Sequence, residues 1–208
     1  AKDNPNSITG VENDVTVRPG DNLVYGITTK QKLNKHLSFD GEIDWSAYTS
    51  DTRVPSSVLE GYLYLNNLGG LFYANNTSTF NKALYGNLKY KYQKLNLKLG
   101  YRRIDPGYRT MGSVYLNNDF EDVTIGAGYK LLKNKLSVNG SGGLQRNNLD
   151  ESKMSSMTRL IASIGLNYSP NQTWNFSGNF SNFNSSTEMT LITSFDTLRY
   201  AQVSKSAG

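Results

Sequence analysis

His36-Leu-Ser-Phe-Asp-Gly-Glu-Ile-Asp-Trp-Ser-Ala47 alternates between polar and apolar side chains at almost every step. A side-chain period of two belongs to a β-strand, and a regular alternation indicates that the two faces of the strand meet different surroundings. The apolar face would carry Leu37, Phe39, Gly41, Ile43, Trp45 and Ala47. The opposite face would carry His36, Ser38, Asp40, Glu42, Asp44 and Ser46.

The same period recurs along most of the chain and predicts an all-β fold. We expect about eight strands, paired as four hairpins, at 22–33, 36–48, 80–92, 95–104, 120–132, 135–146, 157–169 and 173–183. The turns within the pairs are short: Asn34–His36, Gln93–Lys94, Lys133–Asn134 and Pro170–Gln172. The links between pairs are long: 49–79, 105–119 and 147–156. Short turns on one rim and long loops on the other are typical of outer-membrane β-barrels.

The turns also predict the register of the hairpins, because a slip of one residue would move every side chain to the wrong face. In the first hairpin we expect Leu33 to lie opposite Leu37. The Lys133–Asn134 turn sets Leu131 opposite Leu136 and Tyr129 opposite Val138. A three-residue loop at Pro170–Gln172 sets Tyr168 opposite Trp174 and Leu166 opposite Phe176. All four hairpins close with their apolar faces in phase, which indicates an antiparallel meander.

Two features favour a membrane wall over a soluble barrel. A soluble exterior is normally rich in charge, whereas here the polar face of the later strands consists largely of Gly, Ser, Thr and Asn. The aromatic residues also fall at two levels, with an apolar band between them, as they do at the two interfaces of a bilayer. The predicted interface aromatics are Tyr25, Trp45 and Tyr101 near the long loops, and Tyr90, Tyr92, Tyr129, Tyr168 and Trp174 near the short turns. The alternative is a soluble lipocalin-like binding barrel with the apolar face inward.

In the membrane interpretation the polar face lines a lumen. The candidate lumen-lining residues are Lys30, Asp40, Glu42, Asp44, Lys89, Lys98, Arg102, Lys130 and Arg159. The acidic row Asp40, Glu42 and Asp44 could bias a pore toward cations. We favour a plainer interpretation, in which Lys and Arg on neighbouring strands pair with these carboxylates.

The chain offers little material for catalysis, and we expect no enzyme and no cofactor. It has no cysteine and a single histidine, His36, which excludes a zinc site built on His and Cys. A Ser-His-Asp triad would have to use His36, at a predicted turn. Asp119, Glu121 and Asp122 could bind Ca²⁺, but solvated loop carboxylates are the preferred interpretation. The net charge of +5 is scattered, so no nucleic-acid partner is expected.

The chain ends and the first long loop lead to two further expectations. Both ends would lie on the long-loop side, and the tail 184–208 looks like a loop, so we expect a sector of a larger barrel. A closed eight-stranded barrel is the alternative. The loop 54–75 is rich in Leu and Tyr, and we expect it to pack on the barrel or to form an extra hairpin around 66–70. A surface for a partner is the second interpretation of this loop.

The segments Tyr101–Gly112 and Tyr115–Thr124, together with Lys133-Asn-Lys-Leu136 and Gly143-Leu-Gln-Arg-Asn-Asn-Leu149, resemble outer-membrane barrel proteins of Bacteroidota, which are Gram-negative bacteria. The resemblance covers mostly the middle and later half of the chain. It implies an outer-membrane location and a link to nutrient uptake, secretion or assembly of surface machinery, and it carries over no catalytic residue. We expect a porin-like channel, transport or secretion component in contact with the lipid bilayer and possible outer-membrane partner proteins. The alternative is a structural barrel whose outer loops hold a surface partner.

Overall fold

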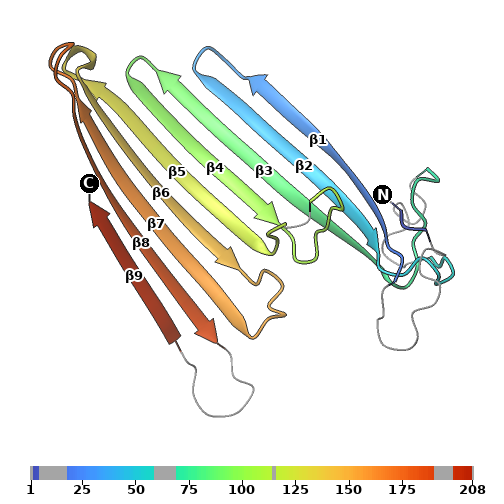
Figure 1. The fold of residues 1–208 in the computed structure, drawn as a ribbon. Helices are drawn as coiled ribbons and strands as arrows, with labels where there is room; N and C mark the ends of the chain where they lie inside the picture. Colours follow the sequence, from blue (N-terminus) through green and yellow to red (C-terminus); the bar gives the residue numbers. More distant parts are fainter. Residues whose placement is uncertain (1, 5–17, 59–68, 114–115, 190–198, 208) are drawn as a thin grey trace. The chain divides into compact units, whose positions relative to one another are not determined.

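The computed structural model describes residues 2–4, 18–58, 69–113, 116–189 and 199–207. These residues form an antiparallel meander in which each strand pairs with its neighbours in the chain (Figure 1). Within the described ranges, no helix is long and apolar enough to cross a membrane. The strands are β1 (Asp21–Lys32), β2 (Leu37–Thr49), β3 (Ser78–Tyr92), β4 (Leu95–Ile104), β5 (Phe120–Leu131), β6 (Leu136–Asn147), β7 (Ser155–Tyr168), β8 (Phe176–Met189) and β9 (Arg199–Ala207).

The all-β meander predicted from the sequence is therefore confirmed, with two corrections. The described residues form nine strands instead of eight, because the tail 184–208, predicted to be loop-like, contains the end of β8 and all of β9. The strand order runs from β1 to β9 with no pairing recorded between these two among the described residues. The sheet is thus open there, and the alternative of a closed eight-stranded barrel is wrong.

The chain divides into two compact units. The first comprises residues 1–27, 43–83 and 107–118, and the second comprises 28–42, 84–106 and 119–208. We call these the loop unit and the strand unit. The strand unit contains β4 to β9 and the four short turns, whereas the loop unit contains most of the long connections.

Three of the predicted short turns agree with the structure in register or in bounds. In the first hairpin, Leu33 N donates a hydrogen bond of 2.9 Å to Leu37 O, as expected for this pair. The strands β3 and β4 are separated by the predicted turn Gln93–Lys94. Leu131 lies opposite Leu136 and Tyr129 lies opposite Val138, both as predicted. The last of these turns is wider than the two predicted residues and contains a short 3₁₀ segment, Leu132–Asn134 (η1).

The fourth turn differs by two residues from its prediction. Tyr168 lies opposite Phe176, not Trp174, and Leu166 lies opposite Gly178, not Phe176. The side chain of Asn171 explains the longer loop: its Oδ1 accepts hydrogen bonds from Thr173 N at 3.0 Å and Trp174 N at 2.9 Å. These two amides are thereby taken away from the strand ladder, as in an Asx turn. Because the shift is an even number, the faces stay as predicted.

In the strand unit the two faces of the sheet differ sharply. Cross-strand rows on one face are apolar, such as the row Tyr101, Val123, Leu144, Leu160 across β4 to β7. Rows on the other face are polar and small, such as Lys98, Gly126, Ser141, Ser163, Ser181, Ser206 across β4 to β9. We call these the apolar face and the polar face. The apolar face is interrupted on β8 and β9 by Asn182, Asn184, Ser186 and Lys205, and the polar face carries Ile161 and Phe183.

The loop unit is built differently, because the long connections pack on its strands. Phe72 is fully buried against Ala47 and Phe80, with its ring 5.9 Å from that of Phe80 in an edge-to-face arrangement. Ala47 and Phe80 belong to the apolar positions of β2 and β3, so this part of the loop covers them. The prediction of a packed loop is confirmed for this segment. The predicted hairpin around 66–70 lies mostly outside the described residues.

The other long connection of the loop unit packs on polar positions. Asn22 donates to Arg109 O at 3.3 Å and accepts from Met111 N at 3.1 Å. Ser46 donates to the same Arg109 carbonyl oxygen at 2.5 Å. The guanidinium of Arg109 lies 4.7 Å above the ring centre of Tyr48. Segment 107–113 is therefore held to β1 and β2 by its backbone, which restricts it to one position.

Candidate functional site

The polar face of the strand unit holds most of the polar residues that the sequence singled out. Its middle is thin, because glycine, serine and asparagine alternate along β5 to β8. Hydroxyl groups bridge neighbouring strands: Ser141 Oγ lies 2.7 Å from Ser163 Oγ, and Ser181 Oγ lies 2.7 Å from Ser206 Oγ. A face of small residues, some of whose hydroxyl groups are paired across the strands, can border water.

A hydrogen-bonded row crosses the polar face near the long loops. Arg102 Nε donates to Asp122 Oδ2 at 2.9 Å, and Gln145 Nε2 donates to Asp122 Oδ1 at 2.6 Å. Arg159 Nη1 donates to Gln145 Oε1 at 3.2 Å. The backbone register places these four residues directly beside one another on β4 to β7. Two predicted lumen residues, Arg102 and Arg159, are thus joined through Gln145, which the sequence analysis did not name, and Asp122, which it assigned to a loop.

The acidic row of β2 is partly neutralised by neighbouring strands. Asp40 forms an ion pair with Lys89 of β3, as the plainer interpretation predicted for this carboxylate. Asp44 belongs to the loop unit, and its carboxylate lies against Gly26 of β1, a position where only glycine leaves room for it. A Cβ added at Gly26 would come within 1.8 Å of Asp44 Oδ1. Glu42 lies between Asp40 and Asp44 in the sequence of alternate residues on the same face of β2. The row is therefore not a continuous line of free carboxylates.

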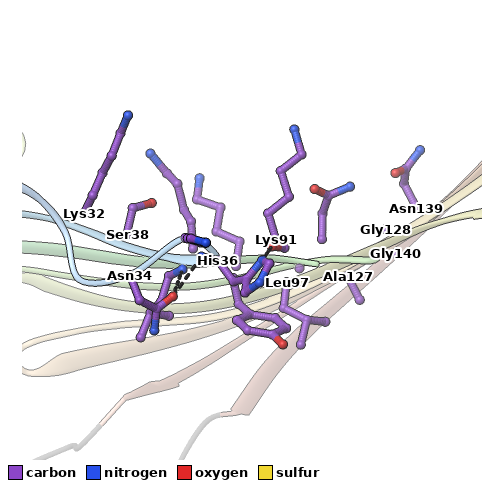
Figure 2. Close-up of a pocket in the computed structure, with 17 residues that line it drawn as sticks. Lys32, Asn34, His36, Ser38, Lys91, Leu97, Ala127, Gly128, Asn139 and Gly140 are labelled. Carbon is purple, nitrogen blue, oxygen red and sulfur yellow. Dashed lines mark hydrogen bonds between the residues drawn. The ribbon is translucent and has the colours of Figure 1, made fainter. Parts of the chain in front are cut away.

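Lysines gather at the short-turn end of the polar face. Five of them, Lys32, Lys35, Lys89, Lys91 and Lys98, line a groove of about 770 Å³ in the strand unit. Lys32, Ser38 and Asn139 point to one side of the sheet, whereas Leu97 and Ala127 point to the other (Figure 2). The predicted lumen residues Lys89 and Lys98 thus belong to this groove. Lys30 and Lys130 lie on strands β1 and β5 that border it.

The predicted interface aromatics lie at both ends of the strands and are partly exposed. In the loop unit, Tyr25 and Trp45 stack with ring centres 5.5 Å apart. At the short turns, His36 packs edge-on against Tyr92 at 4.9 Å and lies 6.4 Å from Tyr90. The other members are placed as follows: Tyr168 and Trp174 each stack on Phe176, Tyr129 lies opposite Leu95 and Val138, and Tyr101 donates to Glu121 Oε1 at 2.6 Å.

The single histidine is engaged structurally at its turn. Its Nδ1 lies 3.0 Å from Lys91 O, and Lys91 N donates to His36 O at 2.7 Å. Since a carbonyl oxygen can only accept, Nδ1 carries the proton in this contact. His36 therefore ties the first turn to the end of β3.

The three carboxylates considered for Ca²⁺ point apart and have separate partners. Asp119 accepts a hydrogen bond from Leu149 N at 2.8 Å and pairs with Lys153 at 2.5 Å. Glu121 is paired with Arg146 on the apolar face, and Asp122 is paired with Arg102 on the polar face. Successive strand residues face opposite sides of a sheet, so Glu121 and Asp122 cannot share one ion.

Some of the residues that the sequence analysis did not place in the site could have been found from the hairpin register, and others could not. Asp122 and Gln145 follow from the predicted register of the β5–β6 hairpin, which places them opposite each other on the polar face. The loop contacts of Asn22 and Ser46 join residues far apart in the chain, and no local pattern reports them.

In comparisons with protein-family models, curated proteins and solved structures, the chain gives no match.

Proposed function

We propose that this chain forms part of the wall of an outer-membrane β-barrel whose polar lumen serves as a channel or as a transport or secretion component. The observation that carries the proposal is the uncovered apolar face of the strand unit. Ile125 is 64% exposed, and Leu99, Leu160 and Ile164 are each about half exposed. Contiguous apolar surface of this extent is characteristic of a surface that meets lipid or another protein.

The lengths of the strands support the same proposal. A transmembrane strand needs about 9–11 residues when it is tilted. The strands of this chain have 9 to 15 residues, as β9 and β3 illustrate. The aromatic rings on the apolar face lie toward both strand ends, which is the arrangement of residues that anchor at the two interfaces of a bilayer. The opposite face, with its small polar residues, is suited to line water.

Two measurements test the proposal at different levels. Heat-modifiable migration on a detergent gel tests the barrel: a folded barrel migrates differently before and after boiling. Planar-bilayer recording tests the channel: the complete barrel to which this chain contributes should give stepwise conductance. A folded monomer that remains soluble without detergent would contradict the membrane location and favour the lipocalin-like alternative. Heat-modifiable migration without conductance would contradict the channel and leave a structural barrel.

A second candidate is an interaction barrel whose outer loops hold a partner. It is favoured by apolar side chains that protrude from the first long loop: Val58, Leu71 and Tyr73 are 70%, 74% and 55% exposed. Leu71 and Tyr73 flank the anchored Phe72, and Ser57, next to Val58, donates a hydrogen bond of 3.1 Å to Ala74 O, so the loop presents all three from a fixed base. Replacing all three with Ser should abolish recovery of an outer-membrane partner after chemical cross-linking in cells while leaving any conductance unchanged. Loss of conductance in this variant would favour the first candidate alone.

A further inference from the structure

The groove at the short-turn end of the strand unit has an unusual charge composition. Its 17 lining residues include five lysines and no aspartate or glutamate. Asp40 of β2 forms an ion pair with Lys89, and Lys98 also interacts electrostatically with Asp40. The ion pairs of the described residues do not involve Lys32, Lys35 or Lys91. Three ammonium groups of the groove are thus without an ion-pair partner in the described part of the protein.

The floor of the groove leaves room for a ligand beside these lysines. Gly126 and Gly128 lie next to Lys98 and Asn96 on the neighbouring strand. A Cβ added at Gly126 would meet its nearest atoms at 3.8 Å, so there is room for a small group there, whereas one added at Gly128 would lie 2.7 Å from Asn139 Oδ1. Asn139 rises on the far side of Gly128, as Figure 2 shows, and supplies an amide that can donate or accept.

The spacing of the lysines suits an anion with more than one charge. Alternate residues of a strand are about 7 Å apart, and neighbouring strands are about 5 Å apart. The lysines of the neighbouring strands β3 and β4 therefore present charges over distances that two or three carboxylate or phosphate groups of one small molecule span, whereas β1 lies two strands away from β3. The groove contains no arginine, and lysine acts as a point charge without the planar fork that fixes a ligand's orientation. Such a site distinguishes ligands by the number of their negative charges more than by their shape.

We propose that this groove binds small multivalent anions, bearing carboxylate or phosphate groups, and that it makes this mouth of the lumen selective for anions. The binding site stands on the geometry of the groove, whereas the selectivity rests on the channel function proposed above. The charge is opposite in sign to the cation preference that the acidic row of β2 would give, because the groove lysines outnumber Asp40. Fixed charges lining an opening raise the local concentration of counter-charged solutes.

Binding is tested by calorimetric titration of the folded full chain in detergent with citrate, pyrophosphate and acetate at matched ionic strength. We expect citrate or pyrophosphate to bind and acetate to bind far more weakly. The groove variant Lys91→Gln/Lys98→Gln should weaken that binding about tenfold, roughly threefold for each charge. The control variant Lys2→Gln/Lys205→Gln removes the same charge elsewhere and should leave it unchanged. Citrate against pyrophosphate distinguishes carboxylate from phosphate ligands.

The result that overturns the site is multivalent binding no stronger than that of acetate, or equal weakening by the groove and control variants. If Lys91→Gln/Lys98→Gln does not fold, Lys32→Gln/Lys35→Gln makes the same test from the β1–β2 turn. Selectivity is measured separately, as the reversal potential across a KCl gradient: it should indicate anion preference that falls in the groove variant. Citrate binding without conductance would contradict the proposed channel and leave the site intact.

Discussion

The ninth strand can be tested by a disulfide between β8 and β9. Ser181 and Ser206 are paired across these strands, with their hydroxyl oxygens 2.7 Å apart. Their replacement by cysteine introduces the only two thiols in the chain, since the sequence has none. Directly paired strand residues have Cα atoms about 4.5–5.5 Å apart, within the range that a disulfide requires. Ser181→Cys/Ser206→Cys should therefore oxidise readily.

The expected stabilisation follows from the length of chain that the bond closes. The loop between the two positions has about 25 residues, and the chain-entropy relation gives about 3.5 kcal/mol for a loop of that length. Oxidation should shift mobility on a non-reducing gel and raise the urea midpoint, both reversibly with reductant. The control Ser181→Cys/Ser204→Cys is offset by two residues, a diagonal separation of about 7–8 Å that a disulfide does not span. Equal oxidation of both pairs, or none in the first, would refute the pairing of β8 with β9.

Three further outcomes are expected in the loop unit. Phe72→Ala should lower the free energy of unfolding by about 3–5 kcal/mol, whereas Leu71→Ala, at a 74% exposed position, should change it by less than about 0.5 kcal/mol; similar urea curves for both would contradict the packing. Asn22→Ala removes the acceptor of the Met111 backbone amide and should lower the free energy of unfolding by about 1–3 kcal/mol. Trypsin should then cleave faster at Arg109. Unchanged cleavage would mean that other contacts hold segment 107–113 in place. Hydrogen bonds from Arg53 lower the pKa of Asp51 from 3.8 to about 2, so the stabilisation from Asp51 is complete above about pH 4 and is lost as the pH falls toward 2. Thermal midpoints of wild type and Asp51→Asn should converge over that range, and a gap independent of pH would argue against the ionised contact.

The strands that alternate cleanly were predictable from the sequence. In β4 and β5, apolar and polar residues exchange at nearly every step, so the pattern defines both the strand and its faces. The loop between them, 105–119, was predicted to the residue for the same reason. A local period is sufficient there because each strand pairs with its neighbour in the chain.

The sequence was insufficient where two arrangements satisfy the same pattern. Trp174 and Phe176 are both aromatic and share a face, so the alternation could not choose which of them lies opposite Tyr168. The hydrogen bonds of Asn171 made that choice. In β9, Gln202, Ser204 and Ser206 share one face, but Lys205 lies among Ala201, Val203 and Ala207 on the other face, so the alternation was too weak to predict a strand. Its backbone pairing with β8 forms it nonetheless.

The candidate site was predictable as a face but not as a set of contacts. Lys89 and Lys98 follow from alternation alone, and they do line the groove. The groove itself depends on the ends of several strands meeting at one level, together with glycines at Gly126 and Gly128. The lengths of the turns, such as the Asn34–His36 loop, determine where the ends of neighbouring strands lie relative to one another. The alternation of apolar and polar residues does not report small errors in turn length.

The meander order has a consequence for how the sheet is made and altered. Every recorded pairing joins strands that are consecutive in the chain. A folding chain can therefore add its strands one after another to a growing edge, and apart from the long β2–β3 and β4–β5 connections each addition closes a short stretch of backbone, for which the entropic cost is small. For the same reason a whole hairpin could be inserted or deleted during evolution without changing any remaining pair. Proteins built in this way can vary their width in steps of two strands while the register of each existing neighbour is preserved.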